Sequence, residues 1–253
     1  MNSEPSVASP VSAPPPGVSY ARADARLADF IDHTFLKPDA TGRDIETLCR
    51  EAAEHRFAAV CVNPVWVPMC VDRLAGSEVK VATVVGFPLG ASEPEGKAAE
   101  AARAAAHGAD EVDMVAAIGQ MKSGDWGHVA RDIEAVVCAV PGRLVKVIIE
   151  SALLSPMQIV QACRVARDAG AHYVKTSTGF SAAGGATVEA VALMRLAVGD
   201  ALGVKASGGI RDGDTAFRMI AAGATRIGTS SGVAMAECHG RGPRPLGELL
   251  ATA

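Results

Sequence analysis

Short runs of apolar, mostly β-branched residues alternate with longer alanine-rich stretches along most of the 253-residue chain. The apolar runs have the length expected of strands that are covered on both faces, about 4–7 residues. They predict strands at residues 30–33, 59–62, 79–85, 111–115, 144–149, 173–177, 204–207 and 226–228. The stretches between them predict helices at residues 42–55, 64–75, 94–107, 127–140, 156–169, 186–198 and 215–222. This alternation is typical of an α/β protein with a parallel sheet.

Eight strands with regular helical crossovers in one chain of this length predict a closed (β/α)8 barrel, the TIM-barrel class. An open doubly wound sheet is the competing fold, and it normally shows a glycine fingerprint such as GxGxxG after its first strand. Here the first predicted strand runs into Asp32-His33-Thr34-Phe35-Leu36-Lys37-Pro38, which contains no glycine, and no GxxxxGK(S/T) motif occurs. We therefore expect the barrel.

The first 20 residues are rich in proline, serine and alanine, with three consecutive prolines at residues 14–16. Such a segment cannot bury enough apolar surface to offset its ordering entropy. We therefore expect a flexible, disordered extension at residues 1–20, followed by a single barrel domain at residues 21–253.

Composition narrows the classes of function. Hydrophobic residues make up 49% of the chain and aromatic residues only 4%, which predicts a core of Ala, Val, Ile and Leu. The net charge is -4 with acidic and basic residues intermixed, so no basic stripe favours nucleic acid. No apolar run approaches the roughly 20 residues that a membrane span needs, and the N-terminus lacks the pattern of a secretory signal. We expect a cytoplasmic protein that binds neither nucleic acid nor membranes.

The six cysteines form no CxxC pair, and the histidines form no HExxH or similar motif. A zinc site or a disulfide framework needs tighter, paired spacing. We therefore predict neither a metal site nor a bound cofactor, and we expect buried thiols in a reducing compartment.

Polar residues stand at the carboxyl ends of the predicted strands, where TIM barrels have their active sites. In chain order these residues are Asp32, Cys61, Asn63, Asp113, Lys146, Glu150, Lys175, Lys205 and Ser207. Lys175 in VKTSTG and Lys205 in VKASGG hold the same place in two patterns that lie 30 residues apart. That separation is about the length of one strand–helix–strand unit, so we expect the two amines at one level on neighbouring strands.

Two interpretations of the strand-end lysines compete. In the first, Asp113 and Glu150 balance the lysines in a structural ion-pair network. In the second, one lysine forms a Schiff base, and a neighbouring ammonium group lowers its pKa. A second charge at about 4 Å, in an effective dielectric constant of about 20, contributes on the order of 4 kcal/mol or about 3 pKa units. That shift leaves free amine near neutral pH, so we favour the catalytic interpretation.

Two loops rich in glycine and serine predict a phosphate site. Ser207-Gly208-Gly209 follows the seventh strand, and Gly228-Thr229-Ser230-Ser231-Gly232 follows the eighth and precedes a segment, residues 233–237, that can form a helix. Loops at these positions commonly bind phosphate in TIM barrels through backbone N–H groups. Gly179 can join them from the loop after the sixth strand. The simpler alternative is that the glycines only form turns and the serines only cap a helix.

Four segments carry, in order, a resemblance to a known family: EVDMV with Asp113, LVKVIIE with Lys146, YVKTSTGF with Lys175 and VKASGGIR with Lys205. Together with AAVCVNP and TVVGFPLG, they resemble the deoxyribose-phosphate aldolases over essentially everything after the N-terminal extension. The resemblance implies a class I aldolase that cleaves 2-deoxy-D-ribose 5-phosphate to D-glyceraldehyde 3-phosphate and acetaldehyde. It implies a small sugar phosphate as the partner and, since family members often self-associate, a homodimer.

The resemblance also implies roles for residues. Lys175 would form the Schiff base, Lys205 would lower its pKa and assist proton transfer, and Asp113 would take part in the proton relay. The candidate substrate- and phosphate-binding residues are Gly179, Gly208, Gly209, Ser230, Ser231, Lys146 and Thr178.

Two positions depart from the family pattern. Some relatives carry a C-terminal tail that ends in tyrosine, whereas the only tyrosines here are Tyr20 and Tyr173. Phe180 follows Gly179 where some members have a lysine, which predicts a weaker electrostatic grip on phosphate. The alternatives that stay open are another Schiff-base aldolase of sugar phosphates and a non-catalytic barrel that binds phosphorylated metabolites.

Overall fold

The computed structural model of the chain describes residues 26–238. The expected extension at residues 1–20, residues 21–25 and the C-terminal residues after 238 lie outside the described residues. The structure is therefore that of the expected barrel domain without its two ends.

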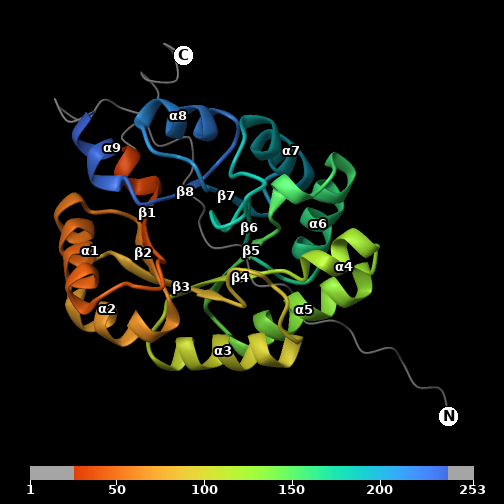
Figure 1. The fold of residues 1–253 in the computed structure, drawn as a ribbon, viewed down its shortest axis with the longest axis horizontal. Coiled ribbons are helices and arrows are strands. Elements are labelled where there is room, and N and C mark those ends of the chain that lie inside the picture. Colours follow the sequence, from red (N-terminus) through yellow and green to blue (C-terminus); the bar gives the residue numbers. More distant parts are fainter. Residues whose placement is uncertain (1–25, 239–253) are drawn as a thin grey trace.

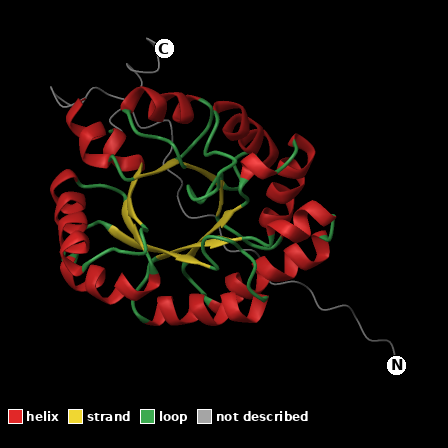
Figure 2. Cartoon of the chain, in the orientation of Figure 1, coloured by secondary structure: helices red, strands yellow, loops and turns green. Residues whose placement is uncertain are grey.

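Eight parallel strands close into one barrel, in which each strand pairs with its neighbours in sequence and the last pairs with the first (Figure 2). The strands are β1 (Ile31–Phe35), β2 (Ala59–Val62), β3 (Lys80–Val85), β4 (Glu111–Val115), β5 (Leu144–Ile148), β6 (Tyr173–Lys175), β7 (Gly203–Ser207) and β8 (Arg226–Thr229). Successive side chains alternate between the barrel interior and the surrounding helices, so almost every strand residue is buried. The predicted (β/α)8 fold is confirmed.

Helices form an outer ring around the strands (Figure 1). They are α1 (Gly42–His55), α2 (Val67–Arg73), α3 (Pro94–Ala106), α4 (Ile118–Ser123), α5 (Trp126–Ala139), α6 (Pro156–Asp168), α7 (Val188–Val198), α8 (Gly213–Ala221) and α9 (Gly232–Cys238). Short 3-10 helices lie at η1 (Leu27–Phe30), η2 (Pro64–Trp66) and η3 (Ser151–Leu153). Local sequence explains where the longer helices begin: Thr41 and Ser155 each form a capping box with the residue three positions later.

Apart from the second helix, the predicted bounds agree with the observed ones to within two residues. The helix predicted at residues 64–75 begins as η2 and becomes α2 only at Val67, because Pro64 and Pro68 have no N–H to donate. The helix predicted at residues 186–198 is α7, and it begins two residues later than predicted, since Thr187 caps it and the N–H of Ala186 donates to the carbonyl of Ser207 instead. The six-residue α4 was missed, because it is too short to show a helical period.

The barrel interior has an apolar half and a charged half. The apolar half is a separate cluster from the first three strands and the loop after β1, made of Leu36, Ala59, Cys61, Ala82 and Val84. The charged half carries the predicted lysines and is formed by side chains of β4 to β8 together with Asp32 of β1. Burial raises the pKa of the Cys61 thiol, which is one of the buried thiols that the sequence predicts.

Lys97 and Asp132 form a fully buried ion pair between α3 and α5, with 2.7 Å between Nζ and Oδ2. The same oxygen accepts the N–H of Ala117 at 3.0 Å. We expect Lys97→Met to lower the free energy of unfolding by about 3–5 kcal/mol, because the variant leaves a buried carboxylate without its counter-ion. Arg50→Met removes an exposed pair with Glu54 and should cost under about 1 kcal/mol. Urea denaturation measures both, and equal losses would contradict the buried pair's importance.

Candidate active site

Lys175 and Lys205 lie side by side at one level of the barrel, as the spacing of the two patterns predicts. They are paired residues in the register of β6 and β7. Their Nζ atoms both donate to Oδ2 of Asp113, at 2.8 Å and 2.7 Å. All three side chains are almost completely buried. Two amines therefore share one carboxylate oxygen in an environment that is nearly closed to water.

Asp113 lies at the centre of this group. Its Oδ1 accepts a hydrogen bond from Nζ of Lys146 at 2.6 Å, so its carboxylate has three lysine donors. Burial alone would raise the pKa of the Asp113 carboxyl, but the charges of the three lysines outweigh burial and hold that pKa well below its usual range. Asp113 therefore stays ionised and orients the amines around it.

The pKa values of the two neighbouring amines, Lys175 and Lys205, shift in opposite directions. Burial is the largest cause that lowers the pKa of Lys175; the charge of Lys205 lowers it further, and Asp113 opposes both. Burial also acts on Lys205, but Asp113 and Asp32 together outweigh it and raise the pKa of that amine. We expected the neighbouring ammonium to be the main cause for Lys175, and burial contributes more. The amine of Lys175 therefore loses its proton more easily than the amine of Lys205.

Lys146 lies deeper in the barrel than the other two lysines. In the register of β5 and β6 it pairs with Tyr173, two residues before Lys175. Its side chain is fully buried, and its Nζ lies 2.5 Å from Oε2 of Glu111 as well as 2.6 Å from Asp113. Carboxylates surround the Lys146 amine, so its contact with substrate stays a prediction that the structure does not test. Lys146 belongs to a buried ion-pair network.

The sequence analysis listed Asp32 among the polar residues at strand ends, and it did not single out Glu111 or Arg226. Asp32 accepts from Lys205 through Oδ2 and from Arg226 through Oδ1, the latter at 2.6 Å. The Arg226 guanidinium also donates to both oxygens of Glu111, at 3.1 Å and 3.2 Å. Glu111 and Arg226 begin their strands, so they lie at the end opposite the mouth. The only signal in the sequence was a charged residue at the first position of each of these two strands.

The loops after β6 and β7 approach each other closely at glycine residues. Gly208 has φ +86°, and a Cβ there would lie 3.1 Å from Cα of Gly185 and 3.4 Å from Cα of Gly179. A Cβ at Gly185 would lie 2.1 Å from the Gly208 carbonyl oxygen, so Gly185 belongs to the same contact although the sequence did not reveal it. Gly209 has φ +81°, and a Cβ there would meet none of the described atoms within 4 Å. These loops therefore bring backbone to the rim of the mouth.

Ser230 and Ser231 continue this rim after β8. The hydroxyl of Thr229 donates to the carbonyl of Ile210 at 2.8 Å, which ties the loop after β8 to the loop after β7. The N–H of Ser231 donates to the same hydroxyl oxygen at 2.9 Å, and Ser230 is exposed. The structure thus places the predicted phosphate-binding residues of the last three strands along one side of the barrel mouth.

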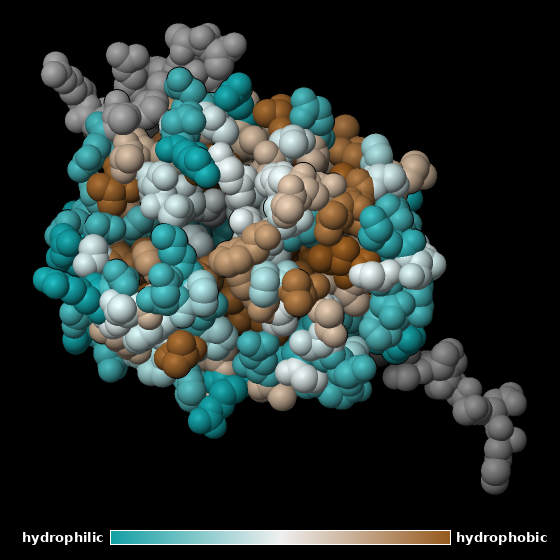
Figure 3. All heavy atoms as spheres, viewed as in Figure 1, coloured by the Kyte–Doolittle hydropathy of each residue, from teal (hydrophilic) through white to brown (hydrophobic). Residues whose placement is uncertain are grey.

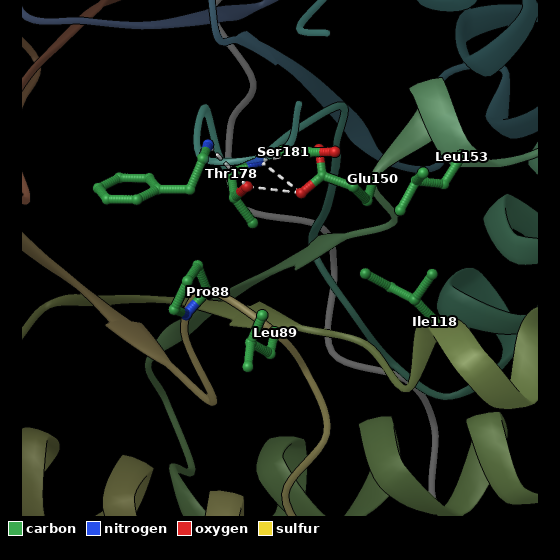
Figure 4. A pocket seen from close by; sticks show the side chains of 8 residues that line it. Pro88, Leu89, Ile118, Glu150, Leu153, Thr178 and Ser181 are labelled. Atoms are coloured by element: carbon green, nitrogen blue, oxygen red, sulfur yellow. Dashed lines mark hydrogen bonds between the residues drawn. The ribbon is translucent and has the colours of Figure 1, made fainter. Parts of the chain in front are cut away.

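A cavity of about 240 Å³ opens at the mouth among the loops that follow β3 to β6 (Figure 4). It is lined by Pro88, Leu89, Ile118, Glu150, Leu153, Thr178, Phe180 and Ser181. The hydroxyl of Thr178 donates to Oε2 of Glu150 at 2.5 Å and accepts the N–H of Phe180 at 3.1 Å. Thr178 therefore forms part of the cavity wall. Glu150, which the network interpretation expected to balance the lysines, holds the loop after β6 instead.

The rim beside this cavity is apolar. Leu89 is 74% exposed and Phe180 is 50% exposed. The rings of Phe87 and Phe180 meet edge to face, with 5.1 Å between their centroids. Figure 3 shows hydrophobic residues gathered toward the centre and right of the face in view. Phe180 therefore supports the rim by packing and offers no positive charge to a phosphate.

Within residues 26–238, no cluster of His, Cys, Asp and Glu side chains is arranged to hold a metal ion. In the same part of the chain, no helix is both long enough and apolar enough to cross a membrane.

We expect Gly208→Ala to weaken the use of a phosphorylated substrate by about 10- to 100-fold, because a Cβ at this positive φ displaces the loops that meet there. Gly119→Ala is the matched control, since a Cβ in this exposed turn of α4 meets none of the described atoms within 4 Å. The measurement is the ratio of kcat/KM for the phosphorylated and unphosphorylated forms of one sugar. An equal fall for both forms in the Gly208 variant would argue against a phosphate site here.

Comparison with known proteins links this geometry to one family. The family model described as DeoC/LacD family aldolase matches residues 27–237. The chain is 61% identical over 206 residues to the deoxyribose-phosphate aldolase of Brevibacillus brevis, a match that covers 81% of this chain and 93% of that protein. It is 59% identical over 210 residues to the deoxyribose-phosphate aldolase of Streptococcus gordonii, with coverage of 83% and 95%.

Solved structures agree with the sequence matches. The deoxyribose phosphate aldolase from Aeropyrum pernix, whose structure is described as tetrameric, has a TM-score of 0.79 and 36% identity over 85% of this chain and 91% of that one. An aldolase designated QR15 has a TM-score of 0.80 and 39% identity over 83% and 94% of the two chains. The region that the family model matches includes Asp113, Lys175 and Lys205.

Proposed function

The chain belongs to the DeoC/LacD aldolase family, and we propose that it cleaves 2-deoxy-D-ribose 5-phosphate reversibly to D-glyceraldehyde 3-phosphate and acetaldehyde through a Schiff base on Lys175. Family membership makes it a carbon–carbon lyase. The observation that carries the proposed mechanism is the pair of amines on Oδ2 of Asp113, one with a lowered and one with a raised pKa.

The first half of the reaction is imine formation. The unprotonated amine of Lys175 attacks C1 of the open-chain sugar, because only a free amine has the lone pair that this step needs. Lys205 keeps its proton and can donate it to the hydroxyl that leaves C1 as water. The product is a protonated imine between C1 and Lys175.

The second half is cleavage of the bond between C2 and C3. The protonated imine accepts the electron pair of that bond when the C3 hydroxyl loses its proton. Asp113 and Lys205 lie beside the imine nitrogen and can carry that proton, directly or through one water. D-glyceraldehyde 3-phosphate then leaves, and the enamine of acetaldehyde stays on Lys175. Protonation at C2 and hydrolysis of the imine release acetaldehyde and restore the amine.

The phosphate group binds at the rim formed by the loops after β6, β7 and β8. The phosphate can approach the backbone closely at Gly179, Gly208 and Gly209, which have no side chains. Hydroxyl groups come from Ser230 and Ser231. The support is the meeting of the glycine loops on one side of the mouth, the position at which TIM barrels commonly bind phosphate. Thr178 and the cavity that it lines belong to the loop that follows Lys175 and β6.

The test is a product assay with purified protein and 2-deoxy-D-ribose 5-phosphate. Acetaldehyde and D-glyceraldehyde 3-phosphate should form in equal amounts, and a chelator should not change the rate. The unphosphorylated sugar serves as the control for the phosphate site and should react more slowly. Binding of the sugar phosphate without any product would favour a non-catalytic barrel. Cleavage of a different sugar phosphate alone would favour another Schiff-base aldolase.

Self-association and cellular location stay predictions. We propose a homodimer in solution, and the tetrameric structure described for the Aeropyrum pernix protein shows that a relative self-associates. Sedimentation equilibrium on the full chain tests this proposal. We also propose a cytoplasmic location, supported by free, buried thiols such as Cys49 and Cys70, which are typical of a reducing compartment.

A further inference from the structure

Charged side chains fill one half of the barrel interior as a continuous chain of ion pairs. They are three carboxylates and four cationic groups: Asp32, Glu111, Asp113, Lys146, Lys175, Lys205 and Arg226. None is more than 8% exposed. With every group ionised, the cluster carries one excess positive charge, and an unbalanced buried charge is costly because it has lost its hydration. The cluster becomes neutral when one cationic group gives up a proton.

The contacts decide which group that is. Lys175 has one carboxylate partner, Asp113. Lys205 has two carboxylate partners, and Lys146 lies within 4 Å of three. Arg226 has two, and a guanidinium group does not lose its proton in proteins. Lys175 therefore has the weakest hold on its proton, and the charge balance of the interior favours its free amine.

We propose that Arg226 and Glu111, at the closed end of the interior, are positioning residues that set whether Lys175 carries a proton. The inference rests on the proposed role of Lys175 as the imine-forming amine. Arg226 supplies the positive charge that balances the carboxylates when Lys175 is neutral, and Glu111 supplies an opposing negative charge. In the part of the chain that the structure describes, neither forms an ion pair with Lys175, so both act through the groups between.

The route from Arg226 to Lys175 is short. Arg226 donates to one oxygen of Asp32, whose other oxygen accepts from Lys205. Lys205 and Lys175 then share Oδ2 of Asp113. Without Arg226, the negative charge of Asp32 is balanced less completely. The cluster then becomes neutral when Lys175 binds a proton, so the loss of Arg226 favours the protonated amine.

Glu111 belongs to the same cluster and carries the charge opposite to that of Arg226. It faces the Arg226 guanidinium with both oxygens, at 3.1 Å and 3.2 Å, and its Oε2 lies 2.5 Å from Nζ of Lys146. When Glu111 is neutralised, the cluster has a positive charge in excess even with Lys175 unprotonated. Its loss therefore disfavours the proton on Lys175.

The other side chains that face Lys175 and Arg226 leave this charge balance unchanged. Lys175 is faced by Asp113 from β4, Lys205 from β7 and Cys61 from β2, while Asp32 from β1 and Lys146 from β5 complete the cluster. Burial raises the pKa of Cys61, so its thiol adds no charge. From β3 the inward side chains are the apolar Ala82 and Val84. Arg226 is faced by Asp32, Glu111, Lys205 in register, and the ring of Tyr173 at 5.8 Å from Cζ.

The size of the effect follows from the register. Arg226 pairs with Lys205, and Lys205 pairs with Lys175, so Arg226 is two strands away from Lys175. Two strand spacings are about 10 Å. One unit charge at about 10 Å, in an effective dielectric constant of about 20, shifts a pKa by about one unit.

The experiment is the pH profile of kcat/KM for cleavage of 2-deoxy-D-ribose 5-phosphate. Activity of the parent protein falls on the acid side as Lys175 gains a proton. Arg226→Met should move this acid limb about one pH unit higher, and the isosteric Glu111→Gln should move it about one unit lower. The double variant should return the limb to near its parent position, and Arg226→Lys, which keeps the charge, should leave it in place.

Opposite shifts that cancel in the double variant are an effect that loss of structure does not produce. Unshifted limbs, or limbs that move in the same direction, in variants with unchanged circular dichroism overturn the inference. If Arg226→Met does not fold, the downward shift of Glu111→Gln, set against Arg226→Lys, decides the question alone. The parent protein separates the two proposals: no cleavage by the parent contradicts the proposed function, whereas cleavage with unmoved limbs contradicts only this inference.

Discussion

Lys175→Met should reduce kcat for cleavage of 2-deoxy-D-ribose 5-phosphate by at least about 10⁴-fold, because the covalent intermediate cannot form. No neighbouring amine can replace it. Lys205 has a raised pKa and keeps its proton, and Lys146 is fully buried among carboxylates. The measurement is a coupled assay of acetaldehyde release at enzyme concentrations high enough to detect residual turnover.

The same variant should fold normally. When Lys175 is neutral, the three carboxylates of the interior balance the three remaining cations, and methionine preserves that balance with a side chain of similar length. We therefore expect its Tm to stay within a few degrees of the parent value. Lys80→Met is the matched control and should keep full activity, because Lys80 is exposed and begins β3 at the end of the barrel opposite the mouth. Turnover by the Lys175 variant within about 10-fold of the parent would contradict the assignment.

Lys205→Met should lower kcat/KM at neutral pH by about 10²- to 10⁴-fold, the range that a general acid–base group contributes. Two effects combine. The variant loses the proton donor beside the imine, and it removes a positive charge that, after burial, lowers the pKa of Lys175. Lys175 then binds its proton more tightly, so the acid limb of the pH profile should move to higher pH and part of the activity should return there.

Lys205→Arg separates these two effects. The guanidinium keeps the positive charge between Asp32 and Asp113 but cannot release a proton. We expect it to lower kcat at every pH while the acid limb stays near its parent position. If both variants had the same profile, or if neither reduced activity, Lys205 would be a structural residue and the proton relay would lie elsewhere.

The fold and the central trio could be predicted because each leaves a local signal. Buried parallel strands read as short apolar runs, so the eight strands and the 30-residue repeat of Lys175 and Lys205 were visible in the chain. The strand-end rule then placed Asp113 with them. Register converts that repeat into contact, since equal positions on neighbouring strands of a barrel face the same space.

The parts that escaped prediction depend on contacts between distant segments. Glu111 and Arg226 lie at the start of strands, where no active-site rule directs attention, and only the closed barrel brings them to Asp32 and Lys146. Gly185 looked like one more loop glycine until its backbone met Gly208.

The contacts of two further charged residues were also hidden in the sequence for this reason. Glu150 closely follows the strand that carries Lys146. Its backbone nevertheless adopts φ +51°, and its carboxylate accepts the hydroxyl of Thr178. Lys146 was listed with the lysines at strand ends, but it lies two residues deeper in the barrel than Lys175 in the register of β5 and β6. Spacing along the chain does not reveal the depth of a residue in a staggered barrel.

Borohydride reduction in the presence of 2-deoxy-D-ribose 5-phosphate, followed by peptide mass mapping, tests the central claim most directly. A reduced adduct on Lys175 blocks tryptic cleavage there, so it should appear on a peptide that spans residues 168–195. The account predicts this adduct in the parent protein and in Lys80→Met, and its absence in Lys175→Met. An adduct on Lys205 or Lys146 instead, or none from protein that is actively turning over substrate, would contradict the Schiff base on Lys175.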